Sequence, residues 1–146
     1  MKKLMLGLIC ALIAVPSIAA NWQRVAGAWD ESDPDSRLYE VDFETIGQKN
    51  GLLQAWIRMS VNKGIDVQNS SGAKYQSSIS LNIYDCKAKE SALHRIALYE
   101  LPFGGGKLYE DLSNDSIDVT RKALKSAIPG SYGATIMREV CAIKNP

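Results

Sequence analysis

The sequence predicts an α+β domain in which a C-terminal helix is packed on one face of a six-stranded antiparallel sheet. Two observations support this prediction. Between Trp22 and Leu112 the chain consists of short runs in which apolar residues occupy alternate positions, the period of a half-buried strand. Turns join these runs, and helical patterns begin only at Ser116. Consecutive strands joined by turns form an antiparallel meander.

The alternation is clearest in the second run, where Tyr39, Val41 and Phe43 alternate with Glu40 and Asp42. An Asn-Gly pair at 50–51 then predicts a tight hairpin turn. In the next run, residues 52–61, odd-numbered apolar residues share one face, and Trp56 lies on the other with polar neighbours. The predicted strands are 22–29, 37–43, 52–61, 75–86, 91–101 and 107–112, with a Gly-rich turn at 102–106.

Two helices are predicted after the strands. The first covers 116–127, begins with Ser116 as cap and ends before Pro129. The second covers 131–143, with Ser131 as N-cap. It has the wider apolar stripe, so we expect it to cover the sheet. The stripe consists of Tyr132, Ile136, Met137, Val140, Cys141 and Ile143.

The face of the fourth strand that this helix covers is ambiguous. Alternate residues from Ile79 to Ile83 form its apolar face, and strict alternation places Cys86 on the opposite face. We expect the helix to cover the apolar face, which requires the strand to end or bulge near Tyr84 and Asp85. The alternative is that the helix packs on the side of Tyr84.

The N-terminus has the pattern of a secretory signal peptide. Two lysines precede an apolar run, which is followed by small residues in MKKLMLGLICALIAVPSIAA. We expect residues 1–20 to be removed by cleavage after Ala19 or Ala20, which leaves 21–146 as a single exported domain without a transmembrane segment. Lipidation at Cys10 is not expected, because Ile9 stands where a small residue should precede the modified cysteine.

The charge and cysteine content of the mature chain exclude several classes of protein. Removal of two lysines leaves 15 basic and 16 acidic residues, so neither nucleic acid nor a membrane surface is an expected partner. Cys86 and Cys141 remain, and a single disulfide is the default for two cysteines in an oxidising compartment. A metal site or a reactive thiol is disfavoured, since His94 is the only histidine.

No catalytic motif is present, so we expect neither enzyme activity nor a cofactor or metal. FGGGK lacks the spacing of a phosphate loop, and DESDPDS lacks the turn glycine of a calcium loop. A basic cluster after Cys86 is either a solvated turn or a contact patch for acidic partners. Its residues are Lys87, Lys89, His94 and Arg95.

The order of several short motifs resembles the surface-adhesin protein E family, small exported proteins of Gram-negative bacteria. These motifs are Trp22, YEVDFETI, Trp56, YQSS, IYDC, Tyr99 before a Gly-rich turn, IPGS and Cys141. The resemblance implies a sheet of about six antiparallel strands, with a C-terminal helix tethered to it by a Cys86–Cys141 disulfide. It also implies an adhesin that binds host extracellular-matrix and serum proteins.

Two functions therefore stay open. The first is a non-enzymatic, adhesin-like module at the outer cell surface. The second is a periplasmic envelope protein that binds a small ligand or another bacterial protein, because the chain has no convincing lipid-attachment motif. The sequence leaves homo-oligomer formation open in both cases.

Overall fold

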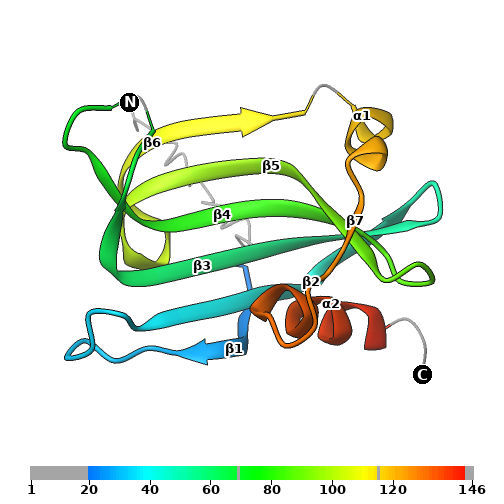
Figure 1. Ribbon diagram of the computed structural model, residues 1–146, viewed down its shortest axis with the longest axis horizontal. Coiled ribbons are helices and arrows are strands. Elements are labelled where there is room, and N and C mark those ends of the chain that lie inside the picture. Colours follow the sequence, from blue (N-terminus) through cyan, green and yellow to red (C-terminus); the bar gives the residue numbers. More distant parts are fainter. Residues whose placement is uncertain (1–19, 69, 115, 144–146) are drawn as a thin grey trace, which may run out of the picture.

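The computed structural model describes residues 20–68, 70–114 and 116–143. The predicted signal peptide lies outside these residues except for Ala20. Six strands form an antiparallel meander in the order β1-β2-β3-β4-β5-β6, and a short seventh strand pairs with β5 (Figure 1). The strands are β1 (Trp22–Ala28), β2 (Arg37–Lys49), β3 (Leu52–Asp66), β4 (Lys74–Asp85), β5 (Glu90–Leu101), β6 (Gly105–Ser113) and β7 (Lys125–Ser126). The predicted α+β class is confirmed.

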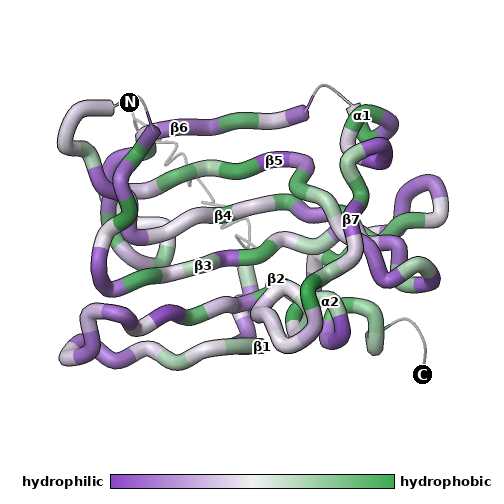
Figure 2. Tube along the Cα trace, in the orientation of Figure 1, coloured by the Kyte–Doolittle hydropathy of each residue, from purple (hydrophilic) through white to green (hydrophobic). Residues whose placement is uncertain are grey.

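Local sequence explains the hairpins well. Asn50 and Gly51 both have positive φ angles, 52° and 79°, as a type I′ turn between β2 and β3 requires. Between β5 and β6, the short 3-10 helix η1 (Pro102–Gly104) replaces a simple turn. Figure 2 shows the hydrophobic and hydrophilic residues alternating along the strands. Alternation therefore gives the sheet two distinct faces.

The main core lies between one face of the sheet and α2 (Tyr132–Ala142). Ser131 caps this helix by accepting a hydrogen bond from the Ala134 N–H at 3.2 Å, as predicted. The buried residues of this core are Val41, Leu53, Ala55, Ile57, Tyr84, Ile136, Met137 and Val140. The helix contacts β1 and β2 most, and its last turn is joined to the end of β4 by the Cys86–Cys141 disulfide, with a Cα–Cα distance of 5.7 Å.

The preferred prediction for β4 is wrong. The strand does end at Asp85, but α2 packs on the face that carries Tyr84, which was the alternative. The other residues on this face of β4 include serines, but the large apolar ring of Tyr84 makes the face part of the core. The burial of Tyr84 raises the pKa of its hydroxyl group. Ile79 and Leu81 therefore lie on the other face of the sheet, away from α2.

The predicted helix over 116–127 is also shorter than expected. Helix α1 (Ile117–Lys122) begins with Ser116 as cap, and residues 125–126 then pair with Glu90 and Ser91 of β5. The physical reason is that β6 pairs with β5 only from Arg95 to Leu101. The backbone groups at the start of β5 are therefore left unpaired by β6 and are available to residues 125–126. A second small core lies here, where Ile117 and Leu124 pack against Leu52, Ile83 and Ala92.

Two other strand boundaries differ from the prediction. The expected connection at 62–74 is shorter, because β3 continues to Asp66 and β4 starts at Lys74. Strand β2 continues to Lys49, beyond the predicted end at Phe43. It does so through an irregular stretch: Asp42 pairs with Trp56, but the next paired residue, Gly47, faces Gln54.

Candidate functional site

The face of the sheet opposite α2 carries a row of residues in direct cross-strand register. Trp22 on β1 faces Asp42 on β2, which faces Trp56 on β3. The row continues with Leu81 on β4 and Arg95 on β5. Because cross-strand neighbours point to the same side of a sheet, two indole rings flank one carboxylate.

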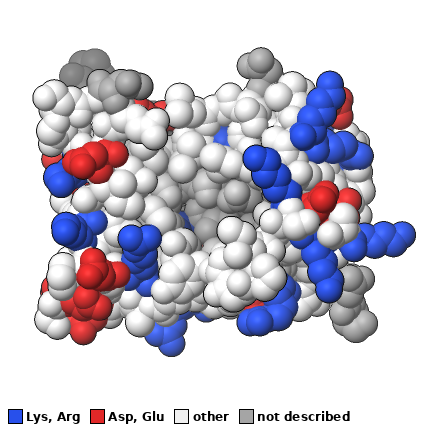
Figure 3. Space-filling view, in the orientation of Figure 1, with Lys and Arg blue, Asp and Glu red and all other residues white. Residues whose placement is uncertain are grey.

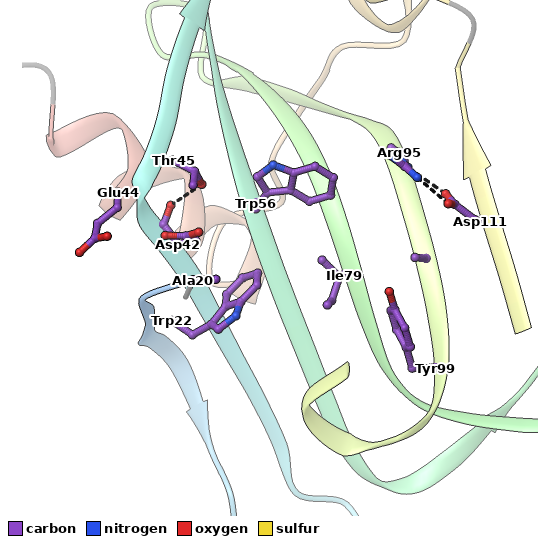
Figure 4. Close-up of a pocket in the computed structure, with 11 residues that line it drawn as sticks. Ala20, Trp22, Asp42, Glu44, Thr45, Trp56, Ile79, Arg95, Tyr99 and Asp111 are labelled. Carbon is purple, nitrogen blue, oxygen red and sulfur yellow. Dashed lines mark hydrogen bonds and ion pairs between the residues drawn. The ribbon is translucent and has the colours of Figure 1, made fainter. Parts of the chain in front are cut away.

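These residues line an open hollow of about 380 Å³, shown from this side of the sheet in Figure 4. Ile79 and Ala97 supply apolar surface in the middle of the sheet, and Tyr99 contributes a third aromatic ring. The hollow has the composition of a binding site, with aromatic and aliphatic walls and a few polar groups. We call it the groove; it is lined by Ala20, Trp22, Asp42, Glu44, Thr45, Trp56, Ile79, Arg95, Ala97, Tyr99 and Asp111.

Strand β2 places two buried carboxylates on this face, and their environments differ. Glu40, 8% exposed, accepts a hydrogen bond and ion pair from Arg58 Nε at 2.7 Å. Asp42, 3% exposed, has one oxygen, Oδ1, without a hydrogen-bond partner among the described residues. Buried carboxylates are normally paired, so Asp42 is the unusual group of the groove.

An irregularity of β2 opens the sheet beside Asp42. Four residues, 43–46, lie between the paired positions Asp42 and Gly47, whereas β3 has only one residue at the corresponding place. Bulges of this kind are frequent next to binding sites, because they redirect side chains. Here Thr45 donates a hydrogen bond to the Asp42 carbonyl at 3.2 Å, and Glu44 accepts one from the Asn21 side chain at 2.9 Å.

Arginines hold the aromatic and acidic groups in place. The guanidinium of Arg58 lies 4.8 Å from the centre of the Trp22 ring and 5.5 Å from that of Phe103. On the other side of the groove, Arg95 donates two hydrogen bonds to Asp111, of 2.8 and 2.5 Å. These hydrogen bonds from Arg95 hold the pKa of the Asp111 carboxyl below its ordinary value.

The four residues of the predicted basic patch do not form one surface. Lys87 and Lys89 are exposed in the β4–β5 turn, where Figure 3 shows Lys and Arg side chains gathering toward the end of the molecule that carries α1. Arg95 belongs to the groove instead. The role of all four residues in partner contact stays a prediction.

His94 has a structural position. It lies at a register shift of β5, and its Nδ1 is 2.8 Å from the hydroxyl oxygen of Thr120, a fully buried residue of α1. This contact ties α1 to the sheet. Within residues 20–68, 70–114 and 116–143, no group of three His, Cys, Asp or Glu side chains is arranged to hold a metal ion. In the same part of the chain, no helix is both long and apolar enough to cross a membrane.

Comparison with known proteins identifies the family. The family model of surface-adhesin protein E matches residues 22–142, which include every strand and both helices. The chain belongs to the surface-adhesin protein E family. The resemblance seen in the short motifs is thereby confirmed. No curated protein matches the chain.

Solved structures of Haemophilus influenzae protein E share the fold of this family member. Crystal form II of that protein is 18% identical, with a TM-score of 0.54, and the match covers 74% of this chain and 83% of the other. The structure from a non-typeable strain is 15% identical, with a TM-score of 0.52 and coverage of 88% and 80%. At these identities the likeness concerns the fold alone.

Sequence reasoning missed most of the groove in this family member. Trp22 and Trp56 were noted only as motif residues, and Asp42 only as the polar partner in an alternating strand. One signal could have found them. Trp56 breaks the pattern of its strand, because it is a large aromatic residue on the face otherwise occupied by Gln54, Arg58 and Ser60.

Proposed function

We propose that the protein is an exported, non-enzymatic binding module of adhesin type that contacts host extracellular-matrix or serum proteins through the groove. The observation that carries this proposal is the groove side of the sheet, which α2 does not cover and on which Trp22, Trp56 and Tyr99 are half-buried around an open hollow. Tryptophan, tyrosine and arginine are the residues most enriched at the energetic centres of protein interfaces.

Family membership and the disulfide support the same proposal. The family is named for surface adhesins, and a disulfide is typical of proteins that leave the reducing cytoplasm. Export of this chain would follow from removal of residues 1–20 as a signal peptide.

The size of the hollow also supports a second candidate function. A volume of about 380 Å³ lies within the usual range of small-ligand sites, roughly 300–1,000 Å³. A periplasmic protein that binds a small ligand would use the same groove without being displayed on the cell surface.

Two experiments distinguish the adhesin from the periplasmic ligand-binding protein: labelling of the protein on intact cells, and binding of the purified protein to matrix and serum proteins. On intact cells, a membrane-impermeant amine-reactive biotin should label the protein, because Lys87 and Lys89 are exposed. A known periplasmic protein in the same cells serves as the unlabelled control. The purified exported protein should also bind one or more members of a biosensor panel of matrix and serum proteins. Labelling only after permeabilisation of the outer membrane, with no binding to the panel, would instead support the periplasmic candidate.

A further inference from the structure

The two buried carboxylates of β2 differ in a way that points to a ligand. They are separated by one residue, point to the same face of the sheet and are buried to a similar extent, with 8% and 3% exposure. Glu40 has its cation, Arg58, at 2.7 Å. Asp42 has no cation within the described chain, and its Oδ1 has no hydrogen-bond partner there.

An unpaired buried carboxylate is unfavourable, and a cation that enters the groove would remove the penalty. The surroundings of Asp42 favour such a cation in two further ways. Trp22 and Trp56, from the strands on either side of β2, place their indole rings on the groove side of the carboxylate (Figure 4), and aromatic faces attract cations. Glu44 adds a second carboxylate to the lining of the groove.

The geometry favours an ammonium over a guanidinium group. A guanidinium binds a carboxylate best through both oxygens, whereas Oδ1 of Asp42 is buried, so at most one oxygen of this carboxylate is open to the groove. The Trp22 ring is also already contacted by the guanidinium of Arg58 at 4.8 Å, which leaves less room there for a second planar cation. A compact ammonium on a flexible chain can reach one oxygen between the rings.

We propose that the groove is a binding site for a primary ammonium group, presented by a lysine side chain of the partner protein. Asp42 accepts the hydrogen bond and balances the charge, and the aromatic rings contact the aliphatic stem. This inference rests on the proposed function, since it specifies the chemistry by which the groove would hold a protein partner.

The test uses the purified exported protein, whose N-terminus is first determined by mass spectrometry, and Nα-acetyl-L-lysine methylamide as probe. Indole N–H resonances of the three tryptophans are followed by NMR during titration. Trp22 and Trp56 should shift in a saturable way, and Trp29, which packs against Phe103 outside the groove lining, should not. The uncharged norleucine analogue, which has a stem of similar length, should shift none of them.

Two variants with the same change of charge give the matched comparison. Asp42→Asn should weaken binding of the lysine probe at least tenfold. Asp66→Asn should leave it unchanged, because Asp66 is an exposed residue at the end of β3, outside the groove. Asp42→Asn should also unfold at the same temperature as the wild type or at a higher one, since a neutral amide is buried more readily than an unpaired carboxylate.

The inference would be overturned if the lysine probe did not shift Trp22 and Trp56, or if Asp42→Asn bound the probe as tightly as the wild type. Ala20 lines the same groove, so the α-ammonium of the processed N-terminus is a rival occupant. If it occupied the site, Asp42→Asn would lower the unfolding temperature and the wild type would not respond to the probe. Binding of matrix proteins without a response to the probe would also overturn the lysine site but leave the proposed function standing. A probe response without binding to any matrix or serum protein would support the site and contradict the proposed function.

Discussion

Replacing Val140 with aspartate is expected to unfold the domain. Val140 is completely buried on α2, in the core that this helix shares with the sheet. The substitution would bury a carboxylate among apolar side chains with no cation beside it, at a cost of several kcal/mol. Because small domains are typically stable by only about 5–15 kcal/mol, the variant should lose its cooperative thermal transition in circular dichroism.

Arg138→Asp is the matched control, since it introduces the same residue on the exposed side of the same helix. Its unfolding free energy should change by less than about 1 kcal/mol. Ile136→Asp should behave like the Val140 variant, because Ile136 is buried in the same core. A Val140→Asp protein with the thermal stability of the wild type would show that this side of α2 does not form the core.

Removing the disulfide is the second change with a large expected effect. The two cysteines are 55 residues apart in the sequence. In the chain-entropy model, closing a loop of this length stabilises the folded state by roughly 4 kcal/mol. The Cys86→Ser/Cys141→Ser double variant should therefore unfold at a much lower denaturant concentration than the wild type. Its free energy of unfolding should also depend more steeply on denaturant, because the unfolded chain without the cross-link exposes more surface.

Reduced wild-type protein is the control, and its unfolding curve should coincide with that of the double variant. Peptide mapping of the exported protein without reductant should recover the two cysteine-containing peptides joined to each other. Two free thiols, or a bond from either cysteine to a second molecule, would contradict the intramolecular tether between α2 and β4.

Most of the fold could be predicted from local sequence. The period of two in the strands, the Asn50-Gly51 turn and the cap at Ser131 each depend on neighbouring residues, and the structure confirms all three. The extent of α1 depended instead on a distant partner. Residues 125–126 leave the predicted helix because the start of β5 offers an unpaired edge, which no local pattern reveals.

The wrong prediction for β4 is informative about function. Sequence reasoning assigned Ile79, Leu81 and Ile83 to the face beneath the C-terminal helix because apolar residues usually mark the core. In the structure Ile83 is buried in the small core under α1, but Ile79 lines the open groove and Leu81 lies in the row between Trp56 and Arg95. An apolar face that no helix covers can have a binding role, and sequence rules are expected to fail at such places.

Asp42 could not have been singled out from the sequence. In YEVDFETI it reads as an exposed polar residue of an alternating strand. Its burial depends on Trp22 and Trp56 from two other strands, and on the irregular stretch at 43–46. The pairing of Glu40 with Arg58, which makes Asp42 stand out, likewise depends on the register between β2 and β3.

The central claim is that the groove, and not the side of the sheet covered by α2, is the binding surface. Its most direct test is the dissociation constant of Trp56→Ser for the matrix or serum protein that the wild type binds most tightly. Tyr132→Ser is the control, since Tyr132 is an exposed aromatic residue on α2. Both variants are compared at a temperature where circular dichroism shows them folded. The account predicts that Trp56→Ser raises the dissociation constant by about 30-fold, corresponding to roughly 2 kcal/mol, and that Tyr132→Ser leaves it within about twofold. Unchanged binding by Trp56→Ser, with a large loss in Tyr132→Ser, would contradict it.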